Sequence, residues 1–177
     1  QGPNETITTA CAASTHAIGY AARLIAWGMI DACVTGGSES AACPIGVASF
    51  GNMTALTSSG NSRPFSPDRD GFVLGEGAAV LMLEEWEAAV ARGANIVGEV
   101  VGAASNADAH HITAPAPGGT GAIKCMQLAL HDAGLVPADI RQINAHGTST
   151  PLNDAAEAAA VTAVFGAGAV PVTSTKG

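Results

Sequence analysis

The sequence predicts an α/β protein in which helices cover both faces of a mixed sheet. Short apolar runs without polar alternation follow one another along the chain, and segments with a helical apolar period separate them. Hydrophobic residues make up 47% of the 177 residues, whereas charged residues make up 12% and aromatic residues 4%. With 22 glycines in addition, the chain is suited to strands and helices that pack closely around a sizeable core.

The apolar runs and the periodic segments give the expected order of the elements. We predict strands at 6–9, 32–35, 78–83, 96–104, 140–145 and 170–173. We predict helices at 12–27, 84–92, 120–133 and 154–165. Gly93 and Gly134 directly follow two of these helices, at the position where glycine commonly ends a helix.

Three segments carry a further expectation. The helix at 12–27 is small or apolar on almost every face, so we expect it to be buried all round. Gly36-Gly37 follows an apolar run and predicts a turn after that strand. Residues 44–75 contain proline, glycine, serine and asparagine without a steady period, and they predict a long excursion rich in loops.

The charge of the chain argues against several classes of function. Seven lysines and arginines stand against 15 acids, for a net charge of −8, whereas nucleic acids and anionic membranes require clustered basic residues. No run of about 18 apolar residues predicts a membrane span, and the first residues do not resemble a signal peptide. The four cysteines show no CxxC spacing, so we expect reduced thiols, no metal and a cytoplasmic protein.

Cys11 is the first candidate for chemistry, because it lies where a predicted strand meets a predicted helix. A thiol at a helix N-terminus faces unpaired N–H groups and the positive end of the helix dipole, which favours the thiolate. A buried structural cysteine is the alternative that position alone leaves open. Cys33, Cys43 and Cys125 lack this setting, and we interpret them as structural.

The second candidate is the string Asn144-Ala145-His146-Gly147-Thr148-Ser149-Thr150-Pro151. It follows a predicted strand, and ligands usually bind at the C-terminal ends of strands in α/β sheets. His146 is able to donate a hydrogen bond or to transfer a proton near neutral pH, and the three hydroxyl residues are able to hold a ligand that carries amides. An ordinary strand–loop–helix connection with a threonine or serine cap is an equal alternative.

Asp154, Glu157 and Lys176 form a third group of candidates. The two acids lie three residues apart at a helix start, where exposed acids also complement the helix dipole. A buried Glu157–Lys176 pair that stiffens the site is the other interpretation, and position alone does not decide between the two. His110-His111 lies in an irregular segment, so we expect no metal site there.

Several strings occur together in a fixed order. They are Thr9-Ala10-Cys11, Gly36-Gly37 with Glu39, Arg63-Pro64-Phe65, Asp68-Arg69-Asp70-Gly71-Phe72-Val73-Leu74-Gly75-Glu76-Gly77, the string at 144–151, Asp154, Glu157 and Ser174-Thr175-Lys176. In this order the chain resembles the β-ketoacyl-acyl carrier protein synthases, especially the elongating type II enzymes of bacterial fatty acid synthesis. The resemblance covers essentially the whole chain.

The resemblance implies a thiolase-like fold of two similar halves, layered α-β-α-β-α and incomplete in this chain. Residues 1–95 correspond to the later part of the N-terminal half, which carries the nucleophilic cysteine. Residues 96–177 correspond to the first part of the C-terminal half, which carries the histidine of the HGTST string. The family's second catalytic histidine is expected a few residues beyond Lys176, so we expect residues 1–177 alone to be inactive.

The resemblance also implies catalytic roles. Cys11 is the expected nucleophile that accepts the acyl group. His146 is one of two histidines expected to stabilise the enolate that malonyl decarboxylation produces. Lys176 matches the lysine that pairs with the position of Glu157, and Asp154 belongs to the same supporting structure.

The implied reaction is the decarboxylative Claisen condensation of an acyl thioester on cysteine with malonyl-acyl carrier protein, which gives β-ketoacyl-acyl carrier protein in fatty acid biosynthesis. Thr148 and Thr150 match threonines that hydrogen-bond the phosphopantetheine arm, and Phe50 matches an aromatic residue of the acyl pocket. The expected partners are acyl carrier protein, its acyl and malonyl thioesters, and a second copy of the full-length enzyme. No cofactor is expected beyond the carrier's phosphopantetheine.

Three alternatives stay open. A ketosynthase domain of a polyketide synthase shares the chemistry, although such modules often carry serines where this chain has Ala12 and Ala13. A non-catalytic chain-length partner subunit has the same fold but typically replaces the nucleophile, and Cys11 is present. A cysteine hydrolase also uses a cysteine–histidine pair, but its local signatures do not occur here.

Overall fold

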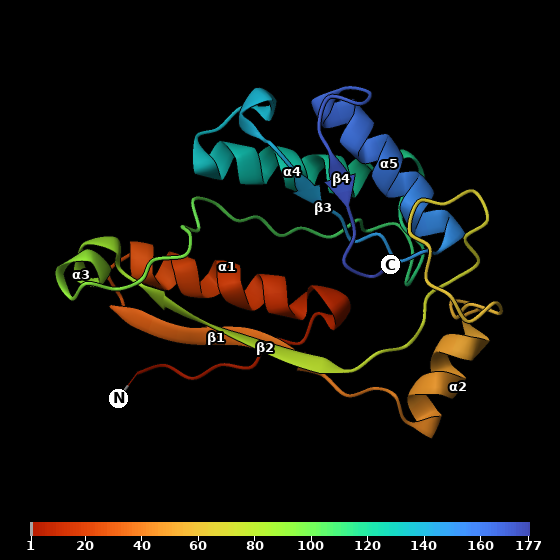
Figure 1. The fold of residues 1–177 in the computed structure, drawn as a ribbon, viewed down its shortest axis with the longest axis horizontal. Helices are drawn as coiled ribbons and strands as arrows, with labels where there is room; N and C mark the ends of the chain where they lie inside the picture. The colour runs from red at the N-terminus through yellow and green to blue at the C-terminus, as the bar shows by residue number, and fades with distance from the viewer. Residues whose placement is uncertain (1) are drawn as a thin grey trace. The chain divides into compact units, whose positions relative to one another are not determined.

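The computed structural model describes residues 2–177 and divides into two compact units (Figure 1). The first unit contains the chain up to Ser40 together with Glu76–Ala103, and the second contains Ala41–Gly75 together with Ala104–Gly177. Each unit therefore combines segments that are distant in the sequence. The assignment of residues 1–95 and 96–177 to two halves of a larger fold stays a prediction.

The first unit is a helix packed on a two-stranded sheet. Strands β1 (Ala32–Glu39) and β2 (Gly77–Glu84) pair antiparallel over their whole length. A short 3₁₀ helix, η1 (Ala10–Ala12), leads directly into α1 (Ala13–Ala26), which runs along the two strands in Figure 1. Helix α3 (Trp86–Ala91) follows β2.

A glycine allows α1 to approach β1 closely. A Cβ atom on Gly37 would lie 1.9 Å from the Ser14 hydroxyl oxygen and 3.0 Å from its Cβ. At the neighbouring Gly36, which has a φ of +150°, a Cβ would lie 2.2 Å from the carbonyl oxygen of Ala79. The two glycines therefore serve close packing inside the strand, and the predicted turn at Gly36-Gly37 is wrong because β1 continues to Glu39.

The second unit contains helices around a small parallel sheet. Its elements are α2 (Pro44–Asn52), η2 (Pro117–Gly119), α4 (Thr120–Ala133), η3 (Pro137–Asp139), β3 (Ile143–Asn144), α5 (Pro151–Phe165) and β4 (Val172–Thr173). β3 and β4 pair in parallel, with Ile143 beside Val172. Helices α4 and α5 pack against each other, and η2 packs against α5. Ala160 of α5 is completely buried in this contact region.

The helix predictions are confirmed. The segments predicted at 12–27, 84–92, 120–133 and 154–165 form α1, α3, α4 and α5. Gly93 and Gly134 end α3 and α4 with φ values of +73° and +66°, the left-handed conformation that glycine adopts without a steric penalty. The strands predicted at 32–35, 78–83, 140–145 and 170–173 are also present. The last two are shorter than predicted, with two residues in each strand.

Several predictions of local structure are wrong. The segments at 6–9 and 96–104 form no strand, since neither pairs with another strand within residues 2–177. The excursion at 44–75 contains α2, which the small and apolar residues after Pro44 concealed because they show no periodic face. Helix α1 buries Gly19, Ala21 and Leu24 but is not buried all round, because in its unit the sheet covers one face. Within residues 2–177 the strands form two separate sheets of two strands each, in place of the predicted mixed sheet.

The close approach of α1 and β1 predicts a destabilising substitution. Gly37→Ala should lower the free energy of unfolding by about 1–3 kcal/mol, because the added methyl group overlaps Ser14 and forces the helix away from the strand. Gly51→Ala in α2 is the control, since a Cβ at Gly51 meets nothing within 4 Å and alanine favours a helix. Urea denaturation of the two variants measures the difference, and equal midpoints would contradict the close approach.

Candidate functional site

Cys11 lies in the first turn of the η1–α1 helix and is exposed. Ala10 before it has a φ of +50°, a left-handed conformation that is strained for a residue other than glycine. The turn is closed by a hydrogen bond from the Ala12 N–H to the Thr9 carbonyl oxygen at 3.1 Å. A cavity of about 850 Å³ opens beside Cys11 in the first unit, so a substrate is able to reach the thiol.

A histidine of α1 braces this turn. The Thr9 hydroxyl and the Nδ1 atom of His16 share a hydrogen bond of 2.6 Å. His16 lies on the first helical turns after Cys11, so the contact ties the residue before the strained turn to the helix that follows it. The bond explains how the backbone of Ala10 is held in a conformation that the isolated chain disfavours.

His146 belongs to the loop of residues 145–150, between β3 and α5, which we call the histidine loop. Its backbone N–H donates to one carboxylate oxygen of Glu157 at 2.7 Å, and the N–H of Gly147 donates to the other at 2.8 Å. The Lys176 ammonium donates to the His146 carbonyl oxygen at 2.6 Å. The backbone of His146 is thus held from both sides, while the residue itself is exposed.

This arrangement changes the interpretation of Glu157 and Lys176. The two side chains form no ion pair with each other among the described residues; instead, each holds the backbone of His146. Glu157 is half-buried and Lys176 is exposed. The stiffening that the sequence suggested therefore acts through the loop backbone, and the predicted direct contact is absent.

Gly147 of the histidine loop is a position that a larger residue could not occupy without moving its neighbours. It is buried with a φ of +45°, and a Cβ there would lie 2.5 Å from the Ser174 Cβ and 3.1 Å from the ring of Phe65. Its carbonyl oxygen accepts a hydrogen bond of 2.9 Å from the Ser174 hydroxyl. The glycine lets the segment before Lys176 pack against the loop, and so brings the lysine within reach of His146.

The hydroxyl groups of Thr148 and Thr150 lie 2.8 Å apart and share a hydrogen bond. Between them Ser149 is completely buried and has a φ of +66°. Its hydroxyl oxygen accepts from the Arg63 N–H, and its carbonyl oxygen accepts from the Gly71 N–H, both at 2.9 Å. Because Ser149 turns inward, the two threonines on either side present their hydroxyls together.

Asp154 in the first turn of α5 is 1% exposed. Its carboxylate accepts from the N–H of Phe65 at 2.7 Å and from the Asn153 side chain at 3.1 Å, and it lies 3.6 Å from the Nε atom of Arg69. Arg69 also donates to the backbone carbonyls of Thr150 and Pro151 at 3.4 and 3.0 Å. The alternative of a water-facing acid is therefore excluded for Asp154, which joins the start of α5 to residues 63–72.

Asp70 anchors the other side of residues 63–72. Hydrogen bonds from the side chain of Thr57, and further ones from Ser58 and Ser59, hold the pKa of the Asp70 carboxyl well below its usual range. The Arg63 guanidinium lies 3.7 Å from the same carboxylate. This cluster fixes the 57–59 turn to the segment that supports the histidine loop.

Phe50 of α2 packs edge-on against Phe72, with ring centroids 5.2 Å apart and an interplanar angle of 81°. Phe72 follows Gly71, whose N–H binds Ser149. The second unit therefore brings together all of the predicted site residues except Cys11, which lies in the first unit.

Of the two other cysteines considered next, Cys43 differs from its interpretation as a plain structural thiol, whereas Cys125 agrees with it. Cys43 is exposed and precedes the first turn of α2, so the statement that it lacks a helix-start setting is wrong. Its helix begins with Pro44, however, which lacks one of the N–H groups that would face a thiolate. Burial raises the pKa of the Cys125 thiol, which makes that cysteine a poor nucleophile.

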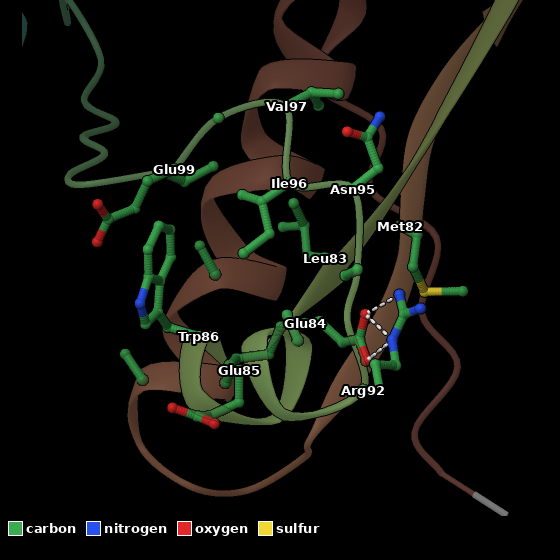
Figure 2. A pocket seen from close by; sticks show the side chains of 17 residues that line it. Met82, Leu83, Glu84, Glu85, Trp86, Arg92, Asn95, Ile96, Val97 and Glu99 are labelled. Atoms are coloured by element: carbon green, nitrogen blue, oxygen red, sulfur yellow. Dashed lines mark hydrogen bonds and ion pairs between the residues drawn. The ribbon is translucent and has the colours of Figure 1, made fainter.

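A separate cavity of about 450 Å³ in the first unit is drawn in Figure 2. Its apolar lining includes Leu83, Trp86 and Ile96. The Arg92 guanidinium at its edge is paired with the Glu84 carboxylate at 2.5 Å. The cavity contains none of the predicted site residues, and its one arginine is already neutralised, so we assign it no chemistry.

No metal centre or membrane span is seen in the part of the chain that the structure describes. Within residues 2–177 no three His, Cys, Asp or Glu side chains gather as metal ligands, and no helix is both long and apolar enough to cross a bilayer. The Nδ1 atom of His111 accepts from the N–H groups of Thr113 and Ala114 at 3.1 and 3.0 Å. This histidine thus closes a turn in its own segment.

Sequence reasoning missed Arg69, Asp70 and Ser149 as parts of the site. A signal was available, since residues 63–70 contain four charged side chains in a chain that is only 12% charged. Clustered charges of both signs in such a segment indicate specific pairing. No comparable signal marked Ser149, whose burial depends on contacts with residues about 80 positions earlier in the chain.

Comparisons with known proteins match this fold and site. Among solved structures, a ketosynthase from a type II polyketide synthase, in complex with its acyl-carrier protein, superposes with a TM-score of 0.95 at 38% identity, covering 98% of this chain and 45% of that one. A beta-ketoacyl synthase from Burkholderia phymatum gives a TM-score of 0.90 at 42% identity, over 96% of this chain and 42% of that one. The fold is therefore the thiolase-like fold of ketosynthases.

The chain belongs to the beta-ketoacyl synthase family. The family model of the N-terminal domain matches residues 1–89, and that of the C-terminal domain matches residues 97–177. Relatives named 3-oxoacyl-[acyl-carrier-protein] synthase 2 are 49% identical in Synechocystis and 50% identical in Rhizobium meliloti, each over 99% of this chain. The chain spans 44% of the length of these two relatives.

The hydrogen bonds around Asp70 predict a pH dependence. A carboxyl whose pKa is depressed by folding contributes stability above its unfolded value of about 4, and this contribution is lost as the pH falls below that value. Asp70→Asn should therefore reduce the stability at pH 7 and flatten its decline between about pH 4 and 2. Urea midpoints across this range measure the effect.

Asp31→Asn is the control for this measurement, because the Asp31 carboxylate is exposed and accepts no hydrogen bond among the described residues. The stability of this variant should fall with decreasing pH in parallel with that of the unsubstituted protein. An Asp70→Asn variant that declines just as steeply would show that Asp70 does not carry the acid sensitivity.

Proposed function

We propose that the enzyme containing this chain is a β-ketoacyl-acyl carrier protein synthase that elongates acyl chains in fatty acid biosynthesis. The observation that carries the proposal is the histidine loop, where Glu157 and Lys176 hold the backbone of an exposed His146. Such a fixed and outward-facing donor suits the stabilisation of a charge that develops on a substrate oxygen. The exposed Cys11 at a helix start supplies the nucleophile.

The first half-reaction is acyl transfer. The Cys11 thiolate attacks the carbonyl carbon of an acyl thioester on acyl carrier protein, and the carrier leaves with its thiol as the acyl-cysteine forms. Two features favour the attacking thiolate: the N-terminal end of η1–α1 and the open cavity beside it.

The second half-reaction forms the carbon–carbon bond. Malonyl-acyl carrier protein loses CO₂, and the electron pair of the broken bond becomes an enolate whose oxygen accepts a hydrogen bond from His146. The enolate carbon then attacks the acyl-cysteine, which releases the Cys11 thiolate and gives β-ketoacyl-acyl carrier protein. The histidine acts here as a neutral donor, so its effect falls on the step in which the enolate charge arises.

The remaining residues are proposed to bind and support. Thr148 and Thr150 present two adjacent hydroxyls to the phosphopantetheine arm, which carries amide groups. Phe50, packed edge-on against Phe72, is proposed to line the acyl pocket. Asp154 supports the loop from the start of α5.

The proposed partners follow from the same chemistry. Acyl carrier protein delivers both thioesters, in keeping with the solved complex of a similar ketosynthase with its acyl-carrier protein. We further propose that the full-length enzyme is a homodimer, that it needs no metal or cofactor of its own, and that it works in the cytoplasm with reduced thiols.

A polyketide ketosynthase is the second candidate. The solved structure with a TM-score of 0.95 comes from a polyketide synthase, and the condensation chemistry is shared. Fatty acid synthesis is preferred because relatives named 3-oxoacyl-[acyl-carrier-protein] synthase 2 are 49% and 50% identical, against 38% for the polyketide ketosynthase. A non-catalytic chain-length subunit is disfavoured because Cys11 is present and exposed.

The proposed nucleophile predicts a pattern of thiol reactivity. In the enzyme expressed from its full reading frame, iodoacetamide should label Cys11 before any other cysteine, because its helix start stabilises the thiolate. Cys43 is the sharpest comparison, since it is also exposed at a helix start but is followed by Pro44. Peptide mapping of Cys11→Ala and Cys43→Ala variants assigns the rates, and faster labelling of Cys43 would refute the assignment.

The proposed donor predicts a division between the two half-reactions. His146→Ala should slow malonyl decarboxylation and condensation by roughly 10²–10³-fold, because an oxyanion donor is lost, while acyl transfer to Cys11 should change much less. Separate assays of CO₂ release and of acyl-cysteine formation measure the two steps. His131→Ala, in an exposed turn at the end of α4, is the control, and equal losses in both half-reactions would contradict the proposed role.

A further inference from the structure

The histidine loop is held at its two ends by different residues. At the His146 end the holding groups are Glu157 and Lys176. The Glu157 carboxylate accepts from two backbone N–H groups and from the Asn153 side chain, and the Lys176 ammonium donates to a backbone carbonyl. At the threonine end the holding groups come from residues 63–72, through the buried Ser149 and through Arg69. The two ends are therefore held mainly by different groups, and the Asn153 side chain links these groups by donating to Asp154 at 3.1 Å and to Glu157 at 3.3 Å.

Arg69 makes the most extensive contacts at the threonine end. The Nε and Nη2 atoms of its guanidinium donate to the carbonyl oxygens of Thr150 at 3.4 Å and Pro151 at 3.0 Å. The Nη1 atom donates to the carbonyl oxygen of Ser66 at 2.9 Å. Its Nε atom also lies 3.6 Å from the Asp154 carboxylate. The side chain is 19% exposed and Asp154 is 1% exposed, so this charge pair is largely shielded from water.

The geometry of these contacts requires a planar fork. A guanidinium has five N–H donors in fixed directions, so it is able to bind three carbonyl oxygens and face a carboxylate at the same time. A lysine ammonium would supply the charge that Asp154 requires, but as a single point it would not reach the same set of carbonyls. A substitution of Arg69 by lysine therefore separates the charge that Asp154 requires from the positioning of the carbonyl oxygens.

We propose that Arg69 is a positioning residue that sets the affinity for the phosphopantetheine arm by fixing the backbone of Thr150 and Pro151. The carbonyl that Arg69 binds belongs to Thr150 itself, whose hydroxyl lies 2.8 Å from that of Thr148. Without Arg69 this carbonyl keeps the Asp154 N–H as a donor at 3.2 Å but loses its tie to residues 63–72. The two hydroxyls then separate more easily, and the arm loses a pre-arranged pair of hydrogen-bond partners. The inference rests on the proposed function, because it takes the threonines as the contacts of the arm.

The consequence is a split between binding and rate. Because His146 keeps its own supports, a change at Arg69 should weaken substrate binding while the chemical step continues. In the full-length enzyme, Arg69→Met should raise the Kd for malonyl-pantetheine and the KM for malonyl-acyl carrier protein by about tenfold, the effect of roughly one lost hydrogen bond. The value of kcat should stay within about threefold.

Three further variants complete the test. Arg69→Lys keeps the charge beside Asp154 and should fold, yet it should restore the Kd only in part. Ser149→Ala removes the acceptor of the Arg63 N–H and should raise the Kd without any change of charge. Arg141→Met is the matched control, since the Arg141 side chain is exposed and makes no hydrogen bond or ion pair among the described residues.

Calorimetric titration with malonyl-pantetheine and steady-state kinetics are the two readouts. Full recovery in Arg69→Lys would show that Arg69 only compensates the charge of Asp154, and a fall in kcat at unchanged Kd would also overturn the proposal. If the unsubstituted enzyme binds malonyl-pantetheine but forms no β-ketoacyl product, the proposed function fails, and the Kd values still decide the role of Arg69. If it does not bind the arm at all, both proposals fail.

Discussion

The carboxylate of Asp154 is a charge held almost entirely away from water, and such a charge is stable only where cations and N–H donors surround it. The N–H of Phe65 and the guanidinium of Arg69 meet this requirement, and both come from residues 63–72. Withdrawal of that segment would leave the carboxylate uncompensated at the start of α5. The buried acid thus fastens a long irregular segment to the helix that follows the histidine loop.

Two of the strained residues of the second unit lie along this connection. Phe65 and Ser149 have φ values of +62° and +66°, a left-handed conformation that residues other than glycine seldom adopt. Each is held by a partly buried hydrogen bond, the first to Asp154 and the second to Arg63. Strain of this kind persists where the surroundings over-determine the backbone. In the histidine loop it has a use, because the inward turn of Ser149 brings the hydroxyls of its two neighbours together.

The first unit uses a different device for the same purpose. Gly37 lets α1 lie close to β1. Cys11 lies at the start of that helix, directly after the strained residue Ala10. The hydrogen bond between the side chains of Thr9 and His16 ties this turn to α1. The proposed nucleophile is therefore fixed by close packing and a local hydrogen bond, whereas the histidine loop is fixed by charged groups that bind its backbone. Each reactive group is supported inside its own unit.

The amino-acid sequence by itself determined helices α1, α3, α4 and α5, the helix ends at Gly93 and Gly134 and the choice of reactive candidates, because periodicity, glycine positions and ordered motifs are local properties of the chain. It also placed Cys11 at a helix start. Only the tertiary structure decided that 6–9 and 96–104 are not strands, since a strand requires a partner elsewhere. It likewise decided that Glu157 and Lys176 bind the backbone of His146 and that Arg69 supports Thr150. These contacts join residues up to about 80 positions apart, and no local pattern specifies which buried carbonyl or carboxylate a distant side chain will meet.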